Sequence, residues 1–248
     1  MRLVEIWRFP VKSLQGERVE AVPVTMAGLE GDRRYAIFDG ATGFGLTARR
    51  EPQLLYASAQ LRGDGGVEIT LPDGSVAADD AALSAWLGRP VTLRSSDEDV
   101  RRRYEDMVDP EDEAGAWEPF DGSPGAFHDF AGASVSLVST ATMGGWDRRR
   151  FRTNLVVEGG AEDDLVGSQV VVGNVVLDVD MRLERCVMTT RPQPGGIDKD
   201  LDVLRTIHRE RERCLAVGAV VGQPGTARVG DAVIVCPAPA DAGRIGRA

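Results

Sequence analysis

Cysteine and histidine are scarce in this sequence, whose 248 residues include three cysteines and two histidines. A disulfide framework, a four-cysteine iron–sulfur cluster and a zinc finger each need more of these residues. An odd, low number of thiols is typical of a reducing cytoplasm, so we expect a cytoplasmic protein. The two histidines, His128 and His208, are too few for a histidine-based triad or metal site, and we expect both to be structural.

Long apolar runs are also missing. No stretch approaches the roughly 18 apolar residues that a membrane span needs, so we expect no association with a membrane. The first six residues, MRLVEI, contain charges where a signal peptide would be apolar, and they predict no export signal. The glycine-rich loops of P-loop and dinucleotide-binding proteins are absent as well.

Acidic residues outnumber basic ones, and most of the excess lies in one segment. The formal net charge of −10 argues against nucleic acid as a partner. Residues Asp97–Asp121 contain eleven carboxylates against three arginines. Because the rest of the chain is nearly neutral, it can still form a pocket for an anion.

Short strands separated by turns are indicated through most of the chain by β-branched and aromatic residues. In the first third they are expected at Leu3–Phe9, Val19–Thr25, Tyr35–Asp39 and Val67–Leu71. In the second half they are expected at Ser134–Val138, Phe151–Val157, Val170–Thr190, Leu215–Val221 and Ala227–Val235, with Gly173-Asn174 as a hairpin turn. Such spacing with glycine turns favours barrels or sandwiches.

Three short helices are expected among these strands. Asp79–Leu87 is typical of a helix with Asp79 as its N-cap and Gly88 after its end. A second helix runs from Ser139 or Thr140 to about Asp147, and a third over Leu201–Arg213 with a stripe of Leu201, Leu204 and His208.

The fold class predicted from these elements is mainly β (β-rich α+β). We expect an N-terminal β-barrel unit over residues 1–96 and a second β-barrel domain with a few short helices over 133–236. The acidic segment between them, 97–132, is either a disordered linker or a lid, and its scattered aromatic residues favour partial docking on the body. The tail, 237–248, is rich in alanine, glycine, proline and arginine and is expected to be disordered.

Cys186 is the cysteine that fits least well as a core residue. If Val175–Thr190 is one regular strand, Cys186 shares a face with Asp178, Asp180, Arg182 and Glu184. Free cysteine is usually buried, so this position suggests a polar cavity, and Arg182 and Arg185 could favour the thiolate. A bulge near Glu184 would undo the assignment of faces. Cys214 and Cys236 fit the role of small core residues.

Basic and hydroxyl side chains recur where predicted elements end. Lys12 and Ser13 follow the first strand, Arg33 and Arg49 lie in two further loops, Ser139 and Thr140 stand where strand gives way to helix, and Arg152 and Asn154 lie further on. Any one of them could be a salt bridge or a cap. Together they suit a phosphate or another anion held in a cleft.

These fragments resemble the family of MOSC proteins, named for the C-terminal domain of molybdenum-cofactor sulfurase. The resemblance is closest to members with an N-terminal β-barrel, such as the amidoxime-reducing component of mitochondria and its bacterial relatives. The matching stretches occur in family order: FPVKS (9–13), GDR (31–33), TARREP (47–52), FRTN (151–154), RCVMTT (185–190) and PGTARVGD (224–231). Thr153 stands where relatives commonly have proline.

The resemblance implies a molybdenum-cofactor-dependent oxidoreductase that takes oxygen from N-hydroxylated substrates, with Cys186 as catalytic residue and molybdenum ligand. It implies that Lys12, Ser13, Arg33, Ser139, Thr140, Arg152 and Asn154 hold the pterin (molybdopterin) and its phosphate, and we add Arg49 from the loop pattern. Because the chain lacks the cysteines for an iron–sulfur domain, electrons would come from a separate donor protein. Asp97–Asp121 would then be a mobile lid or a docking site for that donor.

Two other interpretations remain open. The chain could be a carrier of the molybdenum cofactor or a sulfur-transfer protein without reductase turnover, with a persulfide on Cys186. Descriptions of the family also mention pyridoxal phosphate binding, and Lys12 could in principle form a Schiff base, although no partner for a pyridinium nitrogen is evident.

Overall fold

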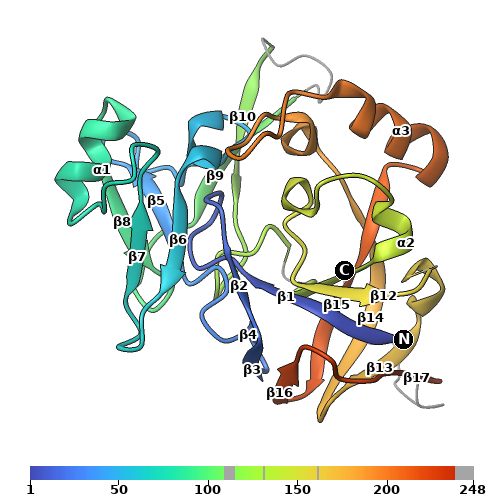
Figure 1. Ribbon diagram of the computed structural model, residues 1–248. Coiled ribbons are helices and arrows are strands. Elements are labelled where there is room, and N and C mark those ends of the chain that lie inside the picture. The colour runs from blue at the N-terminus through green and yellow to red at the C-terminus, as the bar shows by residue number, and fades with distance from the viewer. Residues whose placement is uncertain (109–114, 131, 161, 238–248) are drawn as a thin grey trace.

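The computed structural model of the chain describes residues 1–108, 115–130, 132–160 and 162–237. Strands dominate these residues, which confirms the mainly β fold class (Figure 1). Pro237, expected to begin a disordered tail, belongs to the last strand instead. The rest of that tail, 238–248, lies outside the described residues. No helix in the described ranges is both long enough and apolar enough to cross a membrane.

The strands are β1 (Arg2–Arg8), β2 (Glu17–Val19), β3 (Ala21–Thr25), β4 (Gly28–Leu29), β5 (Tyr35–Asp39), β6 (Ser58–Leu61), β7 (Val67–Thr70), β8 (Val91–Ser95), β9 (Arg103–Met107), β10 (Trp117–Asp121), β11 (Val135–Ser139), β12 (Leu155–Glu158), β13 (Ser168–Val172), β14 (Val175–Glu184), β15 (Cys214–Gln223), β16 (Gly225–Arg228) and β17 (Val233–Pro237). The α-helices are α1 (Asp80–Leu87), α2 (Thr140–Met143) and α3 (Leu201–Arg211). The 3₁₀ helices are η1 (Pro52–Tyr56), η2 (Arg148–Arg150), η3 (Glu162–Leu165) and η4 (Val187–Thr190).

The largest sheet has eight strands in the order β17-β13-β14-β15-β11-β12-β1-β2. Its strands pair antiparallel except β11 and β12, which run parallel. The N-terminal strand β1 lies beside β12, with Ile6 opposite Leu155, so the first residues of the chain complete the sheet of the second half. This arrangement brings the FPVKS stretch, which follows β1, close to the FRTN stretch, which precedes β12.

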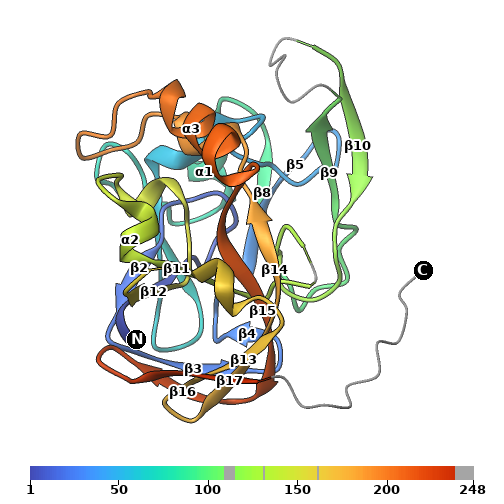
Figure 2. The same ribbon diagram turned by 90° about the vertical axis from the view of Figure 1, so that its right-hand side faces the viewer.

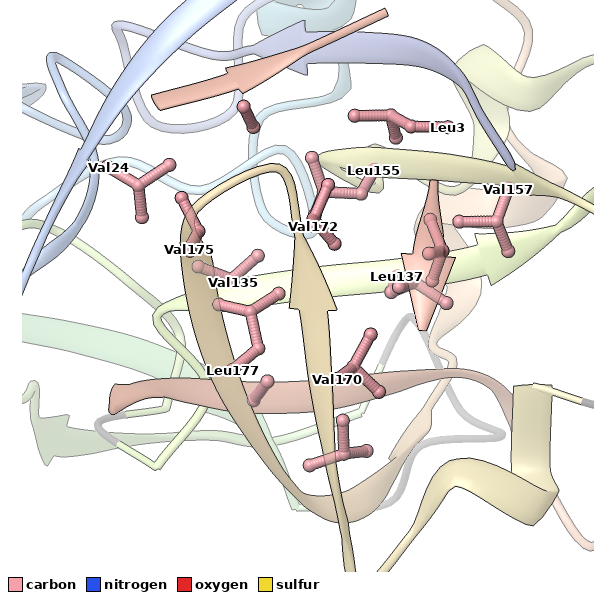
Figure 3. Packing of buried hydrophobic residues seen from close by; sticks show 14 of the residues in the cluster. Leu3, Val24, Val135, Leu137, Leu155, Val157, Val170, Val172, Val175 and Leu177 are labelled. Atoms are coloured by element: carbon pink, nitrogen blue, oxygen red, sulfur yellow. The ribbon is translucent and has the colours of Figure 1, made fainter. Parts of the chain in front are cut away.

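Two apolar cores hold the molecule together. The first lies inside the curved large sheet, where side chains such as Leu3, Leu137, Leu155, Val170 and Leu177 point toward one another (Figure 3). The second lies under β5–β8 and α1, at the left of Figure 1, and includes Val11, Leu14, Ile37, Leu54 and Leu83. Met188 of η4 packs against this second core, so the RCVMTT stretch lies between the two cores.

Local sequence signals placed two features correctly. The Asp79 side chain accepts a hydrogen bond from the backbone N–H of Ala82 (2.9 Å), and Gly88 ends α1 in the left-handed conformation with φ 69°. Gly173 and Asn174 join β13 to β14 as a hairpin, with Gly173 at φ 60°.

Several expectations about elements are wrong. The strand predicted over Val175–Thr190 ends at Glu184, before Cys186. The stripe predicted for the third helix is rotated, because Val203 and Ile207 are buried whereas Leu201 is exposed. The strand predicted from Phe151 begins only at Leu155, after Arg152, whose backbone is left-handed with φ 51°.

Within the acidic segment, β9 and β10 pair antiparallel from Trp117 opposite Met107 to Asp121 opposite Arg103. Figure 2 shows this pair standing at one side of the molecule, away from the large sheet. Tyr104 and Phe120 of the pair pack with Phe38 of β5 and with Phe127 in a small aromatic cluster. Residues 109–114 of the expected lid or linker lie outside the described residues.

Candidate functional site

A cavity of about 490 Å³ opens where the ends of several elements meet. Residues from four separate stretches of the chain form its wall: Arg33, His128, Asp129, Phe130, Ala133, Ser136, Arg150, Phe151, Arg152, Asn154, Met181, Arg182, Leu183, Glu184, Arg185, Cys186, Met188 and Thr189. Arginines form much of the wall, and Phe130, Met181 and Leu183 make another part of it apolar.

Cys186 is the cysteine that lines this cavity. It lies just after β14 and caps η4 with an extended backbone, and its carbonyl accepts hydrogen bonds from the N–H and the Oγ1 of Thr189. The earlier assignment of strand faces therefore does not apply, and irregular register between Arg182 and Glu184 accompanies the end of the strand. Cys186 still lines a polar cavity, as expected, but it does so because it follows the end of β14 and not because it lies on the polar face of a strand.

Burial raises the pKa of the Cys186 thiol, against the opposing effects of Arg49, the backbone N–H of Met188 and Arg185. Arg182, expected to favour the thiolate, is instead occupied by Glu212 at 2.7 Å and Asp163 at 3.5 Å. Burial thus favours the uncharged thiol, whereas the nearby Arg49 and Arg185 guanidiniums favour the thiolate.

Lys12 reaches the same region from the first loop. Its ammonium is buried, donates to the carbonyl of Phe127 (3.1 Å), forms an ion pair with Asp129 and lies 5.0 Å from the centre of the Tyr104 ring. Burial lowers the pKa of Lys12, with Asp129 acting in the opposite direction. Burial would raise the pKa of Asp129, but the charges of Lys12 and Arg49 and the Lys12 hydrogen bond hold it well below its usual range. Asp129 lines the cavity, and its side chain is 71 % exposed, so the neighbouring cations outweigh burial in setting its pKa.

Three of the expected site residues have left-handed backbones, which non-glycine residues rarely adopt. They are Ser13 with φ 70°, Arg33 with φ 52° and Arg152 with φ 51°. The Ser13 hydroxyl accepts a hydrogen bond from the N–H of Ala48 (3.0 Å), which ties the first loop to the loop of Arg49. Such backbones cost about 1–3 kcal/mol each and are typical of residues fixed for function.

Arg33 and Arg152 meet although 118 residues separate them in the sequence. Arg33 forms a bidentate ion pair with Asp32 (2.9 and 3.0 Å) and donates to the carbonyl of Arg152 (3.3 Å). Arg152 donates to the carbonyl of Leu14, and its Nη2 is buried with no hydrogen-bond partner in the described residues. Burial, and then the charge of Arg33, lower the pKa of Arg152 to about 9, which leaves the guanidinium charged at neutral pH.

Arg185 and Arg150 are likewise held by backbone carbonyls. Arg185 donates to Leu215 (2.6 Å) and Phe151 (3.1 Å), and its Nη2 is buried without a hydrogen-bond partner among the described residues. Burial lowers the pKa of Arg185 to about 10. Arg150 donates to the carbonyls of Thr189, Arg191 and Asp198. These contacts fix the guanidiniums and leave their charge uncompensated.

Asn154 lines the cavity, and its side-chain oxygen and one of its amide N–H groups are bonded to neighbouring strands. It accepts from the N–H (3.1 Å) and Oγ (2.9 Å) of Ser136 and donates to the carbonyl of Trp7 (3.2 Å). Its local role is to join β11 to β1 at the cavity edge.

The structure does not bring Ser139 and Thr140 to the cavity wall. Ser139 is buried at the start of α2, where its Oγ accepts from the N–H of Thr142 (3.0 Å). The Glu162 carboxylate accepts from the N–H of Ser139 and from the hydroxyl of Thr142. The hydroxyl that lines the cavity from the same strand is that of Ser136.

Sequence reasoning missed His128 and Asp129, which lie in the acidic segment. His128, expected to be structural, lines the cavity, and its Nε2 is buried without a hydrogen-bond partner in the described part of the chain. Burial lowers the pKa of this imidazole. The signal in the sequence was that Phe127 and Phe130 flank His128 and Asp129, because these aromatic residues indicated that the segment docks on the rest of the protein.

Comparison with known families and proteins agrees with this arrangement. Residues 1–118 match the MOSC N-terminal beta barrel domain, and residues 125–234 match the MOSC domain. The chain therefore belongs to the family of MOSC proteins that carry the N-terminal barrel domain.

Two mitochondrial proteins are distant relatives. Human mitochondrial amidoxime-reducing component 1 is 24 % identical over 93 % of this chain and 82 % of its own length. Mitochondrial amidoxime reducing component 2 of Bos taurus is 24 % identical over 79 % of this chain and 68 % of its own length. Among solved structures, the YUAD protein from Bacillus subtilis is 12 % identical, covers 94 % of both chains and has a TM-score of 0.41, from which we infer nothing. A function related to the molybdenum cofactor follows from the family and these relatives.

Proposed function

We propose that the protein is a molybdenum-cofactor-dependent oxidoreductase that reduces N-hydroxylated compounds, with Cys186 as the protein ligand of molybdenum. The observation that carries the proposal is the position of Cys186 in a cavity whose arginines keep buried, unpartnered N–H groups. The names of the two mitochondrial relatives supply the reaction class.

The donor set fits the cofactor. A soft thiolate suits molybdenum, which brings its own dithiolene sulfurs, so a single cysteine is enough. The phosphate of the pterin needs anchored cations, and Arg33 and Arg152 are anchored at the cavity wall, while Lys12 lies behind it, paired with the wall residue Asp129. The free Nη2 atoms of Arg152 and Arg185 are donors that an anion would satisfy. When bound, the cofactor supplies two-electron oxygen transfer.

The chain's own residues have separable tasks. Cys186 gives up its proton on ligation, and Arg49 and Arg185 offset the burial that raises its pKa. Arg150, Arg152 and Arg185 have carbonyl partners, so their charge is available to balance a phosphate and a thiolate together.

Reduction of an N–O bond consumes two electrons and two protons and releases water. His128 and Asp129 are titratable groups on the cavity wall, and Asp129 accepts a hydrogen bond from the Lys12 ammonium. The apolar part of the wall, Phe130, Met181 and Leu183, suits the uncharged body of such a substrate.

A separate protein would supply the electrons, and we propose that it docks beside the β9–β10 pair. Glu118 and Asp121 are exposed on β10, whereas Asp106 of β9 is paired with Arg49 of the site. A basic donor attracted by these carboxylates would stand near the loop that contacts the cavity.

The test is metal analysis together with activity on amidoximes and other N-hydroxylated compounds, using protein made in a host that synthesises the cofactor. We expect near-stoichiometric molybdenum and reduction of benzamidoxime with a reduced dye in the wild type. Both should fall at least 100-fold in Cys186→Ser and persist in the matched variant Cys236→Ser. Molybdenum without reduction of any compound would favour the carrier function, and molybdenum retained by Cys186→Ser would refute the ligand assignment.

A further inference from the structure

The ring of Phe9 lies against both arginines that approach the proposed phosphate position. The guanidinium carbon of Arg33 is 4.6 Å from the ring centre, and that of Arg152 is 4.5 Å from it. Both distances are within the roughly 6 Å over which a cation is attracted to an aromatic face. Phe9 is the first residue of the FPVKS stretch, and its ring is 3 % exposed.

The positive charges of Arg33 and Arg152 repel each other, and in the part of the chain that the structure describes only one of the two has a carboxylate partner. Asp32 forms an ion pair with Arg33, whereas no carboxylate of the described residues pairs with Arg152. A second carboxylate would hold the pair together but would cancel the charge that an incoming anion needs. An aromatic ring attracts both guanidiniums and leaves their net charge unchanged.

The ring is itself fixed from several sides. The backbone N–H of Phe9 donates to Asp32 (2.7 Å), and its carbonyl accepts from the N–H of Arg33 (2.8 Å). Trp7 stacks on the ring with centroids 6.4 Å apart and an interplanar angle of 20°. A Cβ at Gly16 would lie 2.5 Å from the ring, so position 16 has no space for a side chain. The ring is therefore a rigid support for the two side chains.

We propose that Phe9 is a positioning residue that holds the Arg33 and Arg152 guanidiniums together as a two-pronged clamp for a phosphate or diphosphate group. The proposal rests on the proposed function for the identity of the natural ligand, because the phosphate would be that of the cofactor. The clamp itself can be measured with inorganic diphosphate in protein free of cofactor.

The experiment replaces Phe9 by 4-fluoro- and 3,4,5-trifluorophenylalanine in the full-length chain. Fluorine withdraws electron density from the ring face and changes the volume little. Diphosphate affinity is measured by calorimetry at one fixed salt concentration. We expect a stepwise loss that reaches about tenfold with three fluorines. Phe9→Leu, which keeps an apolar side chain without a ring, should weaken binding at least as much.

Phe44 provides a matched control, because Arg103 lies 4.9 Å from the centre of its ring and neither residue lines the cavity. Trifluorination there should leave diphosphate affinity unchanged. Thermal melting of each variant separates loss of the clamp from loss of the fold.

Three results would overturn the proposal: no diphosphate binding by the wild type, affinity that is insensitive to fluorination of Phe9, or an equal loss on fluorination of Phe44. Failure of the proposed function is distinguishable from these results. Diphosphate binding that falls with fluorination, in a protein that never acquires molybdenum, would support the clamp and contradict the oxidoreductase.

Discussion

Three of the five arginines that line the cavity are held differently from arginines on the outer surface, whereas the other two, Arg33 and Arg182, pair with carboxylates as the surface ones do. On the surface, Arg34 pairs with Asp97 (2.8 Å) and Arg94 with Glu98 (3.2 Å). At the cavity, Arg150, Arg152 and Arg185 donate to backbone carbonyls. A carboxylate neutralises the guanidinium, whereas a carbonyl only orients it. A chain with a net charge of −10 thereby keeps a local excess of positive charge where an anion can use it.

The largest effect on stability is expected from removing a cavity arginine. Arg150→Met would leave the carbonyls of Thr189, Arg191 and Asp198 without their buried donor. This loss should lower the free energy of unfolding by about 3 kcal/mol. Arg94→Met breaks an ion pair whose side chains are about half exposed, and it should cost at most about 0.5 kcal/mol. Urea unfolding measures both, and equal costs would remove the distinction between the two regions.

The second prediction adds charge to the cavity. Asp129→Asn removes the carboxylate partner of Lys12 and should strengthen diphosphate binding about fivefold. This change corresponds to a Coulomb energy on the order of 1 kcal/mol. Asp97→Asn, which frees a surface arginine instead, should have no effect on binding. Unchanged affinity in Asp129→Asn would show that Lys12 does not act on the anion.

The same carboxylate gives a pH dependence. The pKa of Asp129 is depressed in the folded state, so its contribution to stability is fully present above its unfolded pKa of about 3.9. The contribution is lost as the pH falls through the lower folded value. The wild type should therefore melt at a higher temperature than Asp129→Asn by a constant margin from pH 7 to about pH 5, and the margin should narrow only as the pH falls below about 4. A difference that grows on acidification would contradict the assignment.

Much of the fold was predictable because its signals are local. Asp79 and Gly88 mark the ends of α1, and Gly173-Asn174 marks the hairpin, whatever the rest of the chain does. Which face of α3 is buried was not predictable, because apolar stripes at helical spacing can start at either Leu201 or Val203. Packing against η4 and β15 buries the face that contains Val203 and Ile207.

The candidate site was predictable where resemblance supplied motifs and unpredictable where long-range contacts made it. Arg33, Arg152 and Cys186 were expected and line the cavity. His128 and Asp129 lie in a segment dominated by acidic residues, and only the pairing of Asp129 with the distant Lys12 reveals its place. The Ser139 hydroxyl donates to that of Thr142, which donates to Glu162, and position along the chain could not show these contacts.

The fourth prediction separates backbone strain from side-chain function at Arg152. Because φ is 51°, Arg152→Gly should be about 1 kcal/mol more stable than Arg152→Ala. At the exposed helix position 85 the order reverses, and Ala85→Gly should cost about 1 kcal/mol. Both Arg152 variants should lose diphosphate binding alike. Equal stability of the two would mean that position 152 relaxes without strain.

The smallest effect is expected at the acidic surface. The double variant Glu118→Gln, Asp121→Asn should raise the KM for a basic protein donor about threefold at low salt and leave dye-supported activity unchanged. Glu68→Gln on β7 is the matched control on another exposed strand position. A KM that does not change, or that changes equally in the control, would exclude docking beside β9–β10.

The central claim, that Cys186 binds molybdenum in a cavity kept cationic by carbonyl-held arginines, is tested most directly by X-ray absorption at the molybdenum edge. The measurement compares molybdenum in the loaded wild type with molybdenum in the free cofactor. We predict that the metal has one sulfur neighbour more in the protein than in the free cofactor, because the Cys186 thiolate adds to the two dithiolene sulfurs. The same number of sulfur neighbours in both samples would contradict the assignment.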